Sequence, residues 1–193
     1  MLALALTLAA APLVDADAER LARGEVVLHF SEVQGSAYPV ATARVVVDAP
    51  PSRVWPIVAD CERTGEVMPD VATAAVVAES EGASRCTVVV DLPFPLGDLT
   101  SVTRAVLDVR PGHHWQRSWR LVAGDFTVND GYWRLEPTGD GRTIATYHID
   151  VRPTTPLPGW LVSFIQRAKL PEMMQRLRRA AAVRQTTLTA AVR

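Results

Sequence analysis

The middle of the chain, from about residue 70 to residue 153, alternates between short apolar runs and turn-forming residues. The runs are rich in Val, Thr and Ile, and breakers such as Glu81-Gly82 and Pro111-Gly112 separate them. Such runs are typical of β-strands, and short gaps between them favour hairpins and an antiparallel sheet. The pattern predicts six strands, at residues 73–79, 85–92, 100–110, 115–122, 126–136 and 143–151.

A further strand and two short helices are predicted before this block. Residues 41–48 are rich in Val and end at Pro50-Pro51, and proline fits the first turn of a helix. The apolar spacing that follows predicts one helix as far as Asp60. A second helix is predicted at residues 62–68, where Pro69 stops it, because proline disfavours a helical conformation at the preceding residue.

The last predicted element is a long helix. Residues 159–187 carry apolar side chains at helical spacing, and the tail at 186–193 is expected to fray. Pro171 lies inside this stretch and predicts a kink or a break near Leu170. Near the other end of the chain, residues 25–30 form one more β-rich run, in an N-terminal extension that we assign to residues 19–40.

This order of elements predicts an α+β fold. A seven-stranded antiparallel sheet must bury one face, and the long C-terminal helix is the element that can cover it. A strongly twisted sheet of this size curves around such a helix. A cavity can form in the gap between the sheet and the helix.

Strand parity predicts which side chains point into that gap, because alternate residues of a strand share a face. The predicted lining combines this face with the rim and the last helix: Trp55, Met68, Val88, Val90, Thr103, Leu107, Trp115, Arg117, Trp119, Asn129, Trp133, Tyr147, Ile149, Trp160 and Phe164. Aromatic residues in such positions are also typical of an ordinary core. The functional alternative is an apolar ligand pocket with a few polar groups, for which Arg117, Asn129, Thr103 and Tyr147 are the candidates.

Arg117 admits two interpretations. Parity places it on the apolar face, where its guanidinium must meet an acid, a ligand anion or water. Alternatively, a β-bulge shifts the strand register and turns Arg117 to solvent. The cost of burying an unpaired charge favours the second interpretation.

The N-terminus resembles a secretory signal peptide. Residues 2–14 are apolar except for Thr7, and Ala16-Asp17-Ala18 follows as a cleavage-site pattern, so we predict a signal peptide at residues 1–18. The alternative is a short apolar helix packed on the domain, since no Lys or Arg precedes the run. Export would place the protein in the periplasm or outside the cell, and without it the protein would be cytoplasmic. Cys61 and Cys86 could pair in an oxidising compartment or be small buried side chains in the cytosol.

Charge and motifs narrow the classes of partner. The formal net charge is −1, which argues against nucleic acid as the main partner. No His or Cys stands at metal-ligand spacing around the two cysteines, and no P-loop or dinucleotide motif occurs, so neither a metal nor a cofactor is predicted. The basic residues of the C-terminal stretch form either a solvated helix face or a transient contact with anionic lipid head groups. They are Arg167, Lys169, Arg176, Arg178, Arg179 and Arg184.

Four short segments resemble a known family. They are DAPPSRVW at residues 48–55, Asp60 with Met68-Pro69-Asp70-Val71, GYWRLEP at residues 131–137, and PGWLV at residues 158–162 with Leu170-Pro171. Their order is similar to that of the START-like superfamily called polyketide cyclase/dehydrase and lipid transport, and within it of the coenzyme Q-binding START group. The resemblance implies a helix-grip (START-like, Bet v 1-like) domain, which we assign to residues 41–185.

The resemblance does not fix an activity, because the family includes carriers, cyclases and proteins that only bind. None of the four His residues is placed as a convincing catalytic base, and no carboxylate pair stands out. We therefore predict non-enzymatic binding or transport of a hydrophobic small molecule, of the lipid, isoprenoid or polyketide-like class. One alternative is an aromatase/cyclase-type enzyme in which Arg117 and Tyr147 position a polyketide. The other is a protein-interaction module that uses an apolar groove.

Overall fold

The structure, a computed structural model, describes residues 13–80, 82–92, 97–155 and 157–190. Its helices are α1 (Leu13–Ala22), α2 (Pro51–Val58), α3 (Thr64–Val67) and α4 (Gly159–Ala190). Its strands are β1 (Val27–Ser31), β2 (Val40–Val47), β3 (Val71–Ser80), β4 (Ala83–Leu92), β5 (Gly97–Arg110), β6 (His114–Gly124), β7 (Phe126–Pro137) and β8 (Thr143–Pro153). The predicted α+β helix-grip architecture is confirmed, and all six strands of the central block form.

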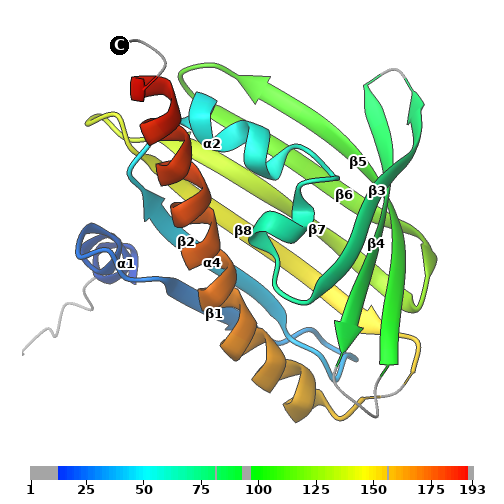
Figure 1. Cartoon of the computed structure of the whole chain (residues 1–193). Helices are drawn as coiled ribbons and strands as arrows, with labels where there is room; N and C mark the ends of the chain where they lie inside the picture. The colour runs from blue at the N-terminus through cyan, green and yellow to red at the C-terminus, as the bar shows by residue number, and fades with distance from the viewer. Residues whose placement is uncertain (1–12, 81, 93–96, 156, 191–193) are drawn as a thin grey trace, which may run out of the picture.

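The strands form a single curved antiparallel sheet in the order β1-β2-β8-β7-β6-β5-β4-β3 (Figure 1). It has one strand more than the seven predicted, because β1 pairs with β2 through partners such as Val27 and Arg44. Helix α1 packs on this edge of the sheet, where Leu21 contacts Val27 and Val46 in a small buried cluster. The predicted cleavage pattern Ala16–Ala18 lies within α1, and most of the predicted signal peptide lies outside the described residues.

Helix α4 lies across the concave face of the sheet, with α2 and α3 beside it (Figure 1). It is a single helix, so the break considered near Leu170 does not occur. Pro171 removes only one backbone donor, and the carbonyl that loses this partner belongs to Arg167, an exposed residue. Water can therefore bind that carbonyl, which explains why the helix continues past the proline.

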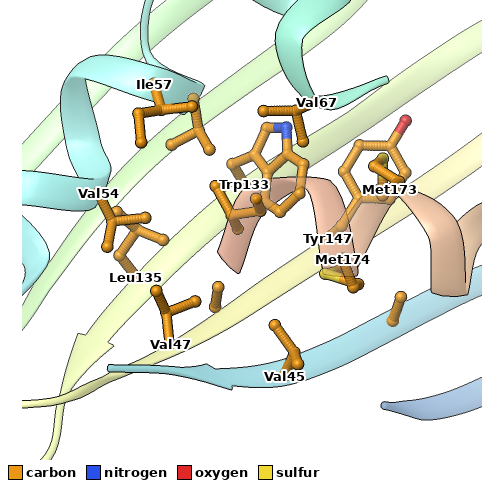
Figure 2. Packing of buried hydrophobic residues seen from close by; sticks show 14 of the residues in the cluster. Val45, Val47, Val54, Ile57, Val67, Trp133, Leu135, Tyr147, Met173 and Met174 are labelled. Atoms are coloured by element: carbon orange, nitrogen blue, oxygen red, sulfur yellow. The ribbon is translucent and has the colours of Figure 1, made fainter. Parts of the chain in front are cut away.

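The surroundings of α4 change along its length. From the middle of the helix onward, Met173, Met174 and Leu177 are fully or almost fully buried. They belong to a core that includes Val45 and Val47 of β2 and reaches α2, as Figure 2 shows. The N-terminal half contributes Val162, Ile165 and Leu170 to a cavity instead. The concave face is thus solidly packed at one end of α4 and hollow at the other.

Candidate ligand-binding cavity

The cavity has a volume of about 260 Å³ and lies between the N-terminal half of α4, α3 and the strands from β4 to β8. Its wall on β4 is formed by the alternate residues Cys86, Val88, Val90 and Leu92, as parity predicts. Ser101, directly opposite Val88, extends this wall onto β5. The lining is mainly apolar, which suits the body of a hydrophobic molecule.

Most of the residues predicted to line the gap between sheet and helix do line this cavity. They are Met68, Val88, Val90, Thr103, Arg117, Trp119, Asn129, Trp133, Tyr147 and Ile149. The strand register explains the agreement, because Arg117, Trp133 and Tyr147 stand opposite one another on β6, β7 and β8. Directly opposed residues share a face of the sheet, so these three side chains form a row across the concave side.

The prediction for the first turns of the last helix was wrong. Trp160 is 72% exposed and Phe164 is 66% exposed, and neither lines the cavity. The helix register is fixed by the buried stripe of Met173 and Leu177. Followed back at helical spacing, that stripe reaches the cavity-lining residues Leu170, Gln166 and Val162, and it leaves the two aromatic residues on the opposite side.

Leu107, Trp55 and Trp115 were also predicted to line the cavity and do not. Leu107 lies further along β5 than Thr103 and is 54% exposed, although its partner Arg117 on β6 is buried. The rings of Trp55 on α2 and Trp115 on β6 meet edge to face, with centroids 5.8 Å apart. They are partly buried against the main core, so they fill the space between α2 and the sheet rather than facing the cavity.

Gln166 and Lys169 also line the cavity, although they were not predicted to do so. Both are polar, and the cavity face of the helix was predicted from its aromatic residues. Their position could have been found from periodicity, because Gln166 is one helical turn before Leu170 and Lys169 is one turn before Met173. Polarity alone therefore misled the assignment of the helix face.

Arg117 is buried on the concave face, with 7% of its surface exposed. The predicted β-bulge at Arg117 does not occur. The register between β5 and β6 shifts instead between Val102 and Thr103 of β5, whose partners on β6 lie beyond Arg117. Its guanidinium carbon lies 5.5 Å from the centroid of the Trp119 ring, within range of a cation–π contact. Burial lowers the pKa of Arg117, although the guanidinium stays charged at any ordinary pH.

Gly131 makes room for Trp119 on the neighbouring strand. A Cβ atom at Gly131 would collide with the backbone oxygen of His148 on β8 and would stand 2.7 Å from the Trp119 ring, so a larger residue would displace the backbone of β8 as well as the indole. The ring is further held by its N–H, which donates to Oδ1 of Asn129 at 3.2 Å. Asn129, a predicted polar group of the cavity, thus positions a wall residue.

Tyr147 is buried beside Trp133, with ring centroids 4.7 Å apart. Burial raises the pKa of the Tyr147 hydroxyl, so this side chain is a neutral phenol at physiological pH. Neither Tyr147 nor Arg117 has an acid within hydrogen-bonding distance in the described part of the chain.

Two cross-links hold the helical cover of the cavity to the sheet. Cys61, between α2 and α3, forms a disulfide with Cys86 on β4, with a Cα–Cα distance of 5.8 Å. The pairing was one of two alternatives left open by the sequence. In addition, Lys169 on α4 forms an ion pair with Asp70, the residue before β3, and the Lys169 nitrogen lies 2.7 Å from the Asp70 carboxylate oxygen. Both links join elements that border the cavity.

Within the described ranges, no three His, Cys, Asp or Glu side chains are grouped so that they could hold a metal ion. The same residues contain no helix that is long and apolar enough to cross a membrane.

Residues 47–178 match the model of the family described as polyketide cyclase/dehydrase and lipid transport. This segment is more than half of the chain, so the protein belongs to that family. No curated protein sequence matches it.

Solved structures with the same fold include lipid-transfer proteins and an aromatase/cyclase. A STAR-related lipid transfer protein from Xanthomonas axonopodis (fragment 25–204) has a TM-score of 0.71 at 17% identity, over 81% of this chain and 93% of that one. Human StAR-related lipid transfer protein 5 has a TM-score of 0.72 at 10% identity, over 89% and 95%. The aromatase/cyclase Zhui from Streptomyces sp. R1128 has a TM-score of 0.55 at 19% identity, over 74% and 90%. At these identities the likeness concerns the fold alone.

Proposed function

We propose that this protein binds and carries a hydrophobic small molecule, of the lipid, isoprenoid or polyketide-like class, without transforming it chemically. The observation that carries the proposal is the apolar cavity between α4 and the sheet. Most of its walls are apolar residues on regular strands, as in pre-formed ligand pockets. The lipid-transfer names of two structural relatives agree with this class of function.

The direct test is to ask what the protein carries when it is purified without detergent. We expect organic extraction of the native protein, followed by mass spectrometry, to yield one class of apolar molecule in an amount comparable to that of the protein. An unrelated protein from the same host serves as the control for background lipid. Repeated extracts that contain no more apolar material than the control would contradict the proposal.

We also propose that the protein works in the periplasm or outside the cell. The Cys61–Cys86 disulfide supports this location, because disulfides persist in oxidising compartments and are rare in the cytosol. The apolar N-terminal run of the sequence supports it as well. Thiol labelling of the protein in intact cells tests the location, since a cytoplasmic chain would carry both thiols in reduced form.

We propose that the cavity is loaded during transient contact with an anionic membrane. Trp160 and Phe164 are exposed on the first turns of α4, one helical turn apart, and Arg167 is exposed next to them. Aromatic rings beside a cation suit the boundary between lipid head groups and acyl chains. The Arg167 guanidinium lies over the ring of Phe30, 4.2 Å from its centroid, and the residue remains exposed, whereas Arg176 is held in an ion pair with Glu172.

Replacing Trp160 and Phe164 together by Ala is expected to lower binding to anionic phospholipid vesicles several-fold. The reason is that these rings supply most of the apolar area exposed on this side of α4. Co-sedimentation with vesicles measures the effect, and Gln175→Ala, at an exposed position further along α4, is the control. Equal vesicle binding by the double variant and the wild type would refute the proposed contact.

A further inference from the structure

Arg117 is a buried charge without a counter-ion. Its Nε atom is buried without a hydrogen-bond partner, and no ion pair joins its guanidinium to a described residue. Among the other charged lining residues, Lys169 pairs with Asp70. The Asp60 carboxylate attracts the guanidinium of Arg117 only at longer range, forms no ion pair with it, and accepts the backbone N–H of Glu62 at 2.9 Å. The ring of Trp119 offsets only part of the cost of burying the guanidinium.

Gln166 presents a second unsatisfied group on the opposite wall. It is 7% exposed, and both its Nε2 and its Oε1 are buried without a hydrogen-bond partner. Among the described residues, these two atoms and Nε of Arg117 are the only buried side-chain nitrogen or oxygen atoms without a hydrogen-bond partner. Native proteins rarely leave such groups unpaired, and here they lie in the same cavity, one on β6 and one on α4.

The size of the cavity restricts what could satisfy them. Its volume of about 260 Å³ lies just below the range of roughly 300–1,000 Å³ that is usual for pockets that hold drug-sized ligands. A compact or single-chain molecule fits this volume better than a lipid with two acyl chains. The apolar walls require an apolar body, while Arg117 requires an oxyanion, which a guanidinium binds through paired hydrogen bonds.

We propose that the ligand is an amphipathic acid. Its apolar part, which is compact or a single chain, fills the cavity, and its carboxylate or phosphate monoester head group accepts hydrogen bonds from Arg117. Gln166 contacts a polar group of the same ligand. This inference rests on the proposed binding function and specifies its ligand class. The guanidinium gains the anion it lacks, and the Gln166 amide gains a partner.

Calorimetric titration with three ligands of equal chain length tests the inference: dodecanoate, dodecyl phosphate and methyl dodecanoate. We expect at least one of the two anions to bind the wild type about 10- to 100-fold more tightly than the neutral ester, the range of a charge-assisted hydrogen bond. Comparison of dodecanoate with dodecyl phosphate distinguishes the two head groups. In Arg117→Met, the preference for the anion should disappear while the affinity for the ester changes less than about threefold.

The stability of the same variant separates recognition from folding. Arg117→Met removes an unpaired buried charge, so its Tm should equal or exceed that of the wild type. Arg120→Met, at an exposed position of the same strand, is the matched control and should keep the preference for the anion. Gln166→Leu should weaken anion binding less than Arg117→Met does, because it removes a neutral partner.

Each outcome distinguishes this inference from the function on which it rests. If the wild type binds the ester as tightly as both anions, the proposal that the ligand is an acid is wrong, and the proposed carrier function stands. If Arg117→Met weakens all ligands equally, Arg117 shapes the cavity without recognising an anion. If the wild type binds none of the three, the inference fails, and extraction of the native protein decides separately whether the binding function stands.

Discussion

Replacing Cys61 and Cys86 together by Ala is expected to lower the free energy of unfolding by about 3 kcal/mol. The disulfide closes a loop between residues 25 positions apart, and it ties the segment between α2 and α3 to β4. Its removal lets the unfolded chain explore conformations that the cross-link forbids. For a domain of this size the loss corresponds to a fall in Tm of roughly 6–12 °C.

Thermal unfolding of the wild type and the double variant, each with and without a reductant, measures this effect. The wild type should lose the same stability when it is reduced, and the double variant should not respond to the reductant. Alanine is the appropriate replacement because both cysteines are buried, and serine would place a hydroxyl in an apolar site. Identical melting of the oxidised and the reduced wild type would show that the cross-link does not stabilise the fold.

The sheet was the part of the molecule most accessible from the sequence. Each strand of the central block carries its own apolar parity and is bounded by turn residues, so local pattern and final structure agree. Val88 and Val90 were assigned to the cavity wall from parity alone, and both line it. The sequence showed a β-rich run at β1, but only the pairing of β1 with β2 in the structure shows that this strand belongs to the sheet.

The helix that covers the cavity could not be placed in the same way. Its exposed aromatic residues Trp160 and Phe164 resemble core residues by type, whereas Gln166 faces the cavity despite being polar. The orientation of α4 is set by Met173 and Leu177, which pack on the core. An assignment from residue type follows the average preference for burial, and it fails where a site places polar groups inside and apolar groups outside.

Arg117 is a second residue whose burial could not be predicted from its residue type. The cost of burying an unpaired guanidinium favoured a bulge that would expose it, because that is the outcome of lowest energy for the chain alone. The structure instead keeps Arg117 buried, and the register shift lies further along the strand pair. A buried group that is unfavourable for the protein alone points to a function, which is why the exception is informative.

Filling the cavity is expected to have the largest effect on binding. Val88 points into the cavity from β4, while its neighbour Val89 is not among the lining residues and belongs to the opposite face of the strand. Val88→Trp should therefore occupy space that a ligand needs. Val89→Trp adds the same side chain to the same strand without entering the cavity, so the two variants form a matched pair.

The most direct measurement is a fluorescence titration of both variants and the wild type with a neutral apolar probe, N-phenyl-1-naphthylamine. We expect Val88→Trp to weaken probe binding at least about tenfold, since the indole displaces the probe from a cavity of about 260 Å³. Val89→Trp should bind like the wild type, and circular dichroism should show that both variants are folded. Equal affinity of both folded variants for the probe would contradict the claim that the space between α4 and the sheet is the ligand-binding site.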